Sequence, residues 1–254
     1  NDIDVNQTDD DMSIDLNQDN YNHDLLKSAS EDTVVGETSD EIVVENWAEL
    51  QYYSSLNDKN YVLKLKENTN YYPMDPSDSS NQILFNNNVT IIGASGAYIG
   101  DTSPNPGNIT YTAMLVPENN GVGITVRNVL FKWVGTRYQP DGVFLQMGGN
   151  TINYFENCYF TNISTNLGHS SILHIKTGDA IATNCTFVNC TTDFGCLSVY
   201  NPKDDPTGTC VLARMNVTDS YFEGNYARTE PGCINNCGIL VVNNSTFYKN
   251  SAFW

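Results

Sequence analysis

The sequence predicts an all-β fold, a parallel β-helix, on three observations. A phenylalanine recurs at intervals of 25 to 35 residues, with an asparagine or aspartate three residues before each one. The position five residues before each phenylalanine is always apolar. Beyond residue 93 the apolar residues show no helical period. Strand-like units that repeat at such intervals indicate a solenoid, in which each coil buries its apolar residues only by stacking on its neighbours.

The repeat is visible when the chain is aligned on Phe131, Phe160, Phe187, Phe222 and Phe247. Three residues before them stand Asn128, Asn157, Asn184, Asp219 and Asn244. We expect the phenylalanines to stack in the interior. We expect the asparagines to occupy turns, because asparagine tolerates the left-handed αL region and its amides can form ladders. The segment "NVTI", which ends at Ile91, is interpreted as a degenerate earlier copy.

The N-terminal part of the chain differs from the repeats. Residues 1–45 hold 14 acidic residues against Lys27 alone, so we expect an acidic, disordered leader or spacer. Its carboxylates could bind Ca²⁺, although their spacing fits no EF-hand loop. Residues 46–254 form the predicted β-helix domain, which opens with a capping helix over 46–56. Asn46 and Glu49 there resemble a capping box, and Trp47, Leu50 and Tyr53 share one helical face.

Charge and composition limit the partners. The net charge of −18 disfavours nucleic acid and anionic membrane, and no apolar stretch is long enough to span a bilayer. The chain has neither an initiator Met nor a signal-peptide core, so we expect a mature form or one whose leader was removed. Nine N-x-S/T sequons indicate an exported, glycosylatable protein, and Asn6 and Asn108 are the predicted acceptors.

The segments "VVNNSTFYKNSA", "VTDSYFEGNYA" and "IATNCTFVNCTT", after "NWAELQYY" and "NNVTIIG", carry a family resemblance. Over roughly residues 45 to 254 the chain resembles the adhesin-like surface proteins of methanogenic archaea. The resemblance implies a right-handed β-helix and an extracellular or cell-surface location. It transfers no functional residue, because the family motif is structural. The usual "GGAI" opening of a coil is replaced here by "FGCLSV" and "PGCINNCGIL".

All seven cysteines lie between residues 158 and 237, and in register they pair by column. The candidate disulfides are Cys158 with Cys185, Cys196 with Cys233, and Cys210 with Cys237. Cys190 is left over. A ladder of reduced, buried thiols is the alternative. A zinc site with His169 or His174 is less well supported, because CxxxC and CxxxxC spacings fit convergent ligands poorly.

Two classes of function stay open. Enzymes with this fold that cleave polysaccharides need clustered carboxylates, and the candidates here are Asp141, Asp179, Asp204 and Asp205. They do not recur along the strands as a row, and His169, Arg137 and Lys176 are isolated. Tyr159 and Tyr221 precede the core phenylalanines and should point outward. They could stack on sugar rings or, the more ordinary role, cover the sheet as cross-strand pairs.

The sequence therefore predicts a non-enzymatic adhesin module, a rigid stalk or binding platform that needs no cofactor. A polysaccharide lyase or hydrolase on the same scaffold is the alternative. The expected partner is a glycan or protein on another cell, or a cell-wall polymer. The chain stops at Phe253 and Trp254, a few residues past the fifth phenylalanine. We expect the coils to continue in a longer parent protein, or the last coil to dock end to end on a second copy.

Overall fold

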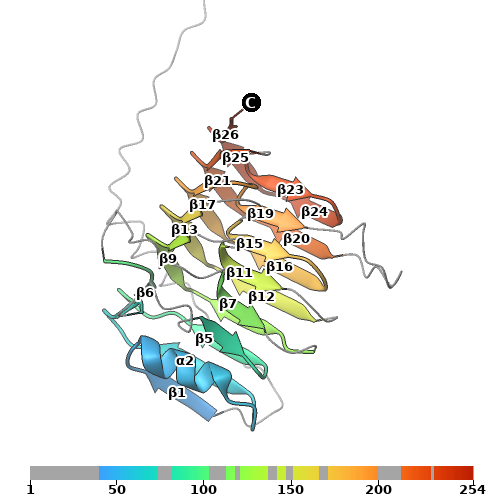
Figure 1. The fold of residues 1–254 in the computed structure, drawn as a ribbon. Helices are drawn as coiled ribbons and strands as arrows, with labels where there is room; N and C mark the ends of the chain where they lie inside the picture. Colours follow the sequence, from blue (N-terminus) through green and yellow to red (C-terminus); the bar gives the residue numbers. More distant parts are fainter. Residues whose placement is uncertain are drawn as a thin grey trace, which may run out of the picture.

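The computed structural model describes residues 40–73, 82–102, 113–117, 121–136, 142–146, 151–165, 171–199, 213–229 and 232–253. Several predictions from the sequence concern residues outside these ranges, and they remain predictions. They concern the leader up to residue 39, the glycosylation acceptors Asn6 and Asn108, Cys210, and the acids Asp141, Asp204 and Asp205. Within the described ranges the chain forms stacked parallel sheets, and the predicted parallel β-helix is confirmed (Figure 1).

Four sheets run along the stack, and from β8 to β23 each coil passes through them in the order A, B, D, C, whereas sheet D has no strand among the described residues before β10. Sheet A consists of β1 (Asp40–Val44), β2 (Tyr61–Leu65), β5 (Val89–Ile92), β8 (Ile124–Arg127), β12 (Ile152–Glu156), β16 (Asp179–Thr183), β20 (Arg214–Thr218) and β24 (Ile239–Asn243). Sheet B consists of β3 (Asn70–Tyr71), β6 (Tyr98–Ile99), β9 (Leu130–Lys132), β13 (Tyr159–Thr161), β17 (Thr186–Val188), β21 (Tyr221–Glu223) and β25 (Thr246–Tyr248).

The other two sheets complete each coil. Sheet C consists of β4 (Ile83–Phe85), β7 (Ala113–Pro117), β11 (Gly142–Gln146), β15 (Leu173–Ile175), β19 (Leu197–Val199) and β23 (Ile234–Asn236). Sheet D consists of β10 (Gly135–Thr136), β14 (Ser164–Thr165), β18 (Thr191–Thr192), β22 (Tyr226–Ala227) and β26 (Ser251–Ala252). All of the strand pairs are parallel, as expected when each coil repeats the path of the one before it.

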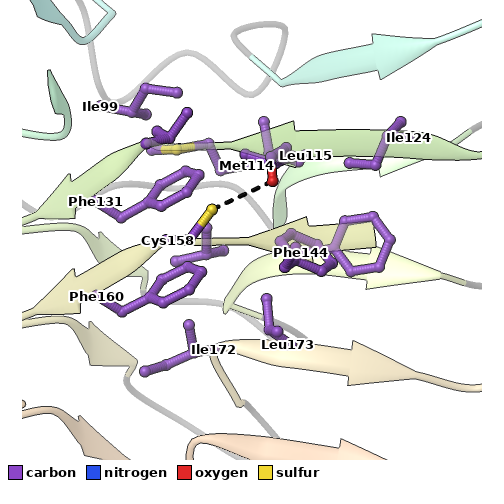
Figure 2. Close-up of a cluster of buried hydrophobic side chains, with 14 of the residues drawn as sticks. Ile99, Met114, Leu115, Ile124, Phe131, Phe144, Cys158, Phe160, Ile172 and Leu173 are labelled. Atoms are coloured by element: carbon purple, nitrogen blue, oxygen red, sulfur yellow. Dashed lines mark hydrogen bonds between the residues drawn. The ribbon is translucent and has the colours of Figure 1, made fainter. Parts of the chain in front are cut away.

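The predicted phenylalanine column forms the core beneath sheet B. Phe131, Phe160, Phe187, Phe222 and Phe247 pair in register, and their rings stack nearly parallel, with centroids 4.6 to 4.8 Å apart. The first four are fully buried, whereas Phe247 in the last coil is 45% exposed. Figure 2 shows Phe131 above Phe160, with Phe144 of sheet C beside them. Stacking of the coils therefore buries phenylalanine side chains that a single coil could not bury.

The predicted degenerate copy is also a coil. Ile91 of β5 pairs with Val126 of β8, and Ile99 of β6 takes the place of a phenylalanine beside Phe131. Gly93 follows β5 where a Cβ atom would lie 1.8 Å from the carbonyl oxygen of Asn128 in the next coil. Only glycine fits so close an approach between neighbouring backbones.

The N-terminal end is covered by one strand and one helix. The helix α2 (Trp47–Ser55) buries Trp47 and Leu50, and the side chain of its N-cap, Asn46, accepts a hydrogen bond of 3.0 Å from the backbone of Glu49. Asn86, just after β4, donates from its backbone to the carbonyl of Ser54 and from its side chain to the carbonyl of Ser55. These bonds hold the C-terminal end of α2 beside β4, the first strand of sheet C. This confirms the predicted capping helix and places it over the edge of sheet C.

The boundary of the predicted leader is wrong at its C-terminal end. Residues 40–44, assigned to the disordered segment, form β1, which pairs in parallel with β2 at the edge of sheet A. Val44 is fully buried, and its carbonyl oxygen accepts a hydrogen bond of 2.5 Å from the hydroxyl of Tyr71. The apolar residues of "DEIVV" thus belong to the fold, despite the acidic context.

Candidate ligand-binding face

Each strand of sheet B lies between two residues whose backbone is in the left-handed αL region. These residues form one column before the sheet and a second column after it. Before the strands, Asn128, Asn157, Asn184, Asp219 and Asn244 all have positive φ, between 44° and 57°. After the strands, Trp133, Asn162, Asn189, Gly224 and Lys249 do so as well, between 51° and 60°. The first column confirms the predicted turn role of asparagine, whereas the second was not predicted. Between them each strand of the complete coils has three residues, with its central phenylalanine pointing inward.

The predicted amide ladder forms over part of the first column. Asn157 donates to Asn128 at 3.2 Å, and Asn184 donates to Asn157 at 2.7 Å. Asn244 donates to the carboxylate of Asp219. The ladder therefore ties neighbouring coils together at the edge of sheet B, with a gap between Asn184 and Asp219 in this part of the structure.

Tyr159 and Tyr221 both lie on the outward side of sheet B, as the alternation predicted. Each is partly exposed, and Thr186 lies between them in the register. They are therefore two coils apart and do not form a cross-strand pair with each other. The hydroxyl of Tyr221 donates a hydrogen bond of 3.0 Å to Glu223, which fixes the direction of the side chain. The predicted site residues thus share one column but do not touch.

Three residues that the sequence did not single out extend this face. Tyr98 continues the tyrosine column, because it pairs with Leu130, which in turn pairs with Tyr159. The ammonium group of Lys132 lies 4.8 Å from the ring centroid of Tyr98 and 3.9 Å from that of Trp133. Both distances are within the range of cation–π contacts. This end of the face is therefore an aromatic cluster around a cation.

Trp133 has a backbone conformation that bulky residues rarely adopt. Its φ is +54°, at a position where other coils have Asn162, Asn189, Gly224 or Lys249. A bulky side chain in this region costs of order 1–3 kcal/mol of conformational strain. Such strain is typical of functional positions, since the fold alone is served better by asparagine or glycine. The indole is thus a candidate for a ligand contact.

Three carboxylates among the described residues, those of Asp179, Glu156 and Asp193, each lie beside an arginine. Asp179, a candidate catalytic acid, lies on sheet A, 3.9 Å from Arg214. Glu156 lies 2.6 Å from Arg127 on the same sheet, and Asp193 lies 3.3 Å from Arg228. Among the described ranges no group of three or more His, Cys, Asp or Glu side chains could hold a metal ion. Each of these acids is thus placed in an ion pair.

The outward column of sheet C is buried over its three central coils. Leu145, His174 and Ser198 are neighbours in register, and their exposed fractions are 3%, 2% and 2%. His174, considered above as a zinc ligand, therefore has apolar and hydroxyl-bearing neighbours in its column. A ligand that approaches from solvent would meet sheet B rather than this face.

The predicted disulfides are not present in the described part of the chain. Cys158, Cys185, Cys196, Cys233 and Cys237 are all free, and Cys210 lies outside the described residues. The column pairing itself is correct, since Cys158 neighbours Cys185 and Cys196 neighbours Cys233. The alternative, a ladder of reduced and mostly buried thiols, therefore describes these residues.

The buried thiols before sheet B act as hydrogen-bond donors. The thiol of Cys158 donates to the carbonyl of Val126 at 3.4 Å, as the dashed line in Figure 2 shows, and that of Cys185 donates to Phe155 at 3.3 Å. Both thiols also lie 3.5 Å from the carbonyl oxygen two residues before them, and Ser220 and Ser245 in the same column donate to the equivalent carbonyl. The cysteines thus act as apolar equivalents of serine at a turn.

Burial makes these thiols poor acids. It raises the pKa of Cys190 and of Cys233 to about 12, and that of Cys158 and Cys196 well above the usual range. The neighbouring thiol of Cys185 raises the pKa of Cys158 further. Since the thiolate is the reactive form, the cysteines of the core have little nucleophilic or metal-binding character.

No helix among the described residues is long and apolar enough to cross a membrane. Comparison of the chain with protein-family models, with curated proteins and with solved structures finds no match.

Proposed function

We propose that this domain is a non-enzymatic carbohydrate-binding module of an extracellular adhesin, and that it binds its glycan through the outward face of sheet B. The observation that carries the proposal is the column of partly exposed tyrosines, Tyr98, Tyr159 and Tyr221, on one straight sheet face. Aromatic side chains with a polar tip suit sugars, because the ring packs on the apolar face of a pyranose while the hydroxyl bonds to its edge.

Two further features support binding rather than cleavage. The tyrosines stand two coils apart, with Leu130 or Thr186 between them in the register, so they do not cover one another as cross-strand pairs. Lys132 contacts aromatic rings and Glu223 is bonded to Tyr221, whereas the carboxylate of Asp219, before the same strand, accepts a hydrogen bond from Asn244. Both carboxylates are thus engaged by neighbouring side chains, whereas a glycosidase needs two carboxylates directed at opposite sides of a scissile bond. The glycan would belong to another cell or to a cell-wall polymer.

A glycan array probed with the purified protein tests the proposal. We expect binding to a defined group of glycans, with no new reducing ends or unsaturated products when the bound glycans are incubated with the protein. The Tyr159→Ala/Tyr221→Ala variant should bind weakly, whereas Ile181→Ala on the outward side of sheet A should bind normally. Cleavage of a bound glycan would show an enzyme, and absence of binding to every glycan would refute the module's proposed function.

A further inference from the structure

We infer that the glycan is a linear polymer with a two-sugar repeat, an extended β-1,4-linked chain that lies along the stacking axis of the coils on sheet B. This inference rests on the proposed function and adds the linkage, the direction and the register of the bound chain. It depends on the spacing of three tyrosines, Tyr98, Tyr159 and Tyr221.

The three tyrosines occupy every second coil. In register, Tyr98 pairs with Leu130, Leu130 with Tyr159, Tyr159 with Thr186, and Thr186 with Tyr221. A coil without an aromatic residue thus separates each tyrosine from the next. The periodicity of this face is therefore two coils, although the fold itself repeats every coil.

The core gives the length of that period. The ring centroids of Phe160 and Phe187 are 4.7 Å apart, and those of Phe187 and Phe222 are also 4.7 Å apart. Tyr159 and Tyr221 precede Phe160 and Phe222, so two steps of 4.7 Å place them about 9.4 Å apart along the axis. Two pyranose rings joined by equatorial 1,4 bonds have about this length.

A β-1,4-linked chain fits the spacing of the tyrosines in length, and its conformation also fits their occurrence at every second coil. Successive rings of a β-1,4-linked chain are turned over relative to each other, so the same ring face recurs at every second sugar. A column with an aromatic residue at every second coil contacts equivalent faces only of such a chain. An α-1,4-linked chain curls and would leave a straight row after a few rings. The intervening Leu130 and Thr186 would face the alternate rings.

The two ends of the face provide polar contacts for the chain. At one end Lys132 lies between Tyr98 and Trp133, where its ammonium group can donate to sugar hydroxyls. At the other end Glu223 lies beside Tyr221, where its carboxylate can accept from them. From Tyr98 to Tyr221 the face covers four coil steps, which corresponds to five sugar rings. Trp133 lies beside the cation at the edge of sheet B, in the coil after that of Tyr98.

Calorimetric titration with soluble oligosaccharides of two to seven rings tests this inference. The probes are the β-1,4-linked series of glucose, N-acetylglucosamine and mannose, with the α-1,4-linked glucose series as the control. In at least one β-1,4 series we expect affinity to rise in steps, up to about tenfold each, at three rings and at five rings. Four rings should bind about as well as three, and six about as well as five.

Two variants assign the steps to residues. Tyr98→Ala should keep the step at three rings and lose the step at five. Tyr159→Ala should lose the step at three and keep one at five, where Tyr98 and Tyr221 are both engaged. Ile181→Ala, on the outward side of sheet A, is the matched control and should retain both steps. A smooth rise with length, equal binding of the α-1,4 series, or array binding without affinity for any β-1,4 series would overturn the inference and leave the proposed function standing. Absence of all glycan binding would instead refute the proposed function.

Discussion

Asn184 donates a hydrogen bond of 2.7 Å to Asn157 in the coil before it, but Asp219, the next member of the column, cannot donate one to Asn184. A carboxylate only accepts, whereas each amide in the ladder donates to one neighbour and accepts from the other. The ladder resumes above the gap, where Asn244 donates to Asp219. One side chain thus interrupts an otherwise continuous contact between coils.

Asp219→Asn should restore the ladder and stabilise the protein by about 0.5–1 kcal/mol, close to the net value of one hydrogen bond. Asparagine also suits the φ of +52° at this position. The free energy of unfolding from urea titration measures the effect. Asn157→Asp is the matched control and should be destabilising, because it removes the donor to Asn128. A stability loss in Asp219→Asn would mean that the ladder contributes nothing here.

Phe187→Ala should cost about 3–5 kcal/mol of unfolding free energy, since it empties a fully buried position between two stacked rings. Thr186→Ala, one residue earlier on the outward side of the same strand, should cost well under half as much. Chemical denaturation of both variants compares the two faces of β17. Equal losses would contradict the assigned inward and outward sides.

Raising the pH should destabilise the protein above about pH 9. Burial raises the pKa of Cys190 to about 12, so the unfolded chain releases this proton first and binds fewer protons than the folded state. Stability from this thiol is complete below the unfolded pKa and falls by about 1.4 kcal/mol per pH unit until the folded pKa is reached. Denaturation between pH 8 and pH 11 should show a shallower loss for Cys190→Ala than for the unchanged protein.

Reducing agents should leave the melting temperature unchanged, because the described cysteines are free thiols. Cys185→Ser should be tolerated within about 1 kcal/mol, since Ser220 and Ser245 make the equivalent bond in neighbouring coils. Thermal melts with and without dithiothreitol check the first statement and urea titration the second. A lower melting temperature under reduction would indicate a disulfide after all.

The sequence predicted the fold well because the repeat places chemically similar residues in the same column. The phenylalanines, the asparagines with positive φ and the capping helix all follow from residue types at fixed spacing. The second left-handed column could not be predicted, because its members are Trp133, Asn162, Asn189, Gly224 and Lys249 and share no type. β1 was missed because its five residues, two acidic and three apolar, adjoin a long acidic segment.

The candidate site was only partly predictable. Tyr159 and Tyr221 could be placed outward from their position before Phe160 and Phe222. Tyr98 could not, since three additional residues separate Ile91 from Ile99 compared with the spacing in later coils. The disulfide prediction failed for a different reason. Register brings the cysteines together, but sequence does not show that a thiol there has a carbonyl to bond.

One paired measurement tests the central claim, that the tyrosines of sheet B serve binding rather than stability. The double variant Tyr159→Ala/Tyr221→Ala is compared with the unchanged protein in two assays, affinity for the best glycan from the array and free energy of unfolding in urea. Our account predicts at least a tenfold loss of affinity with less than about 2 kcal/mol of lost stability, because both side chains are partly exposed. Unchanged affinity together with a large loss of stability would show that the tyrosines only cover the sheet, and would contradict the account.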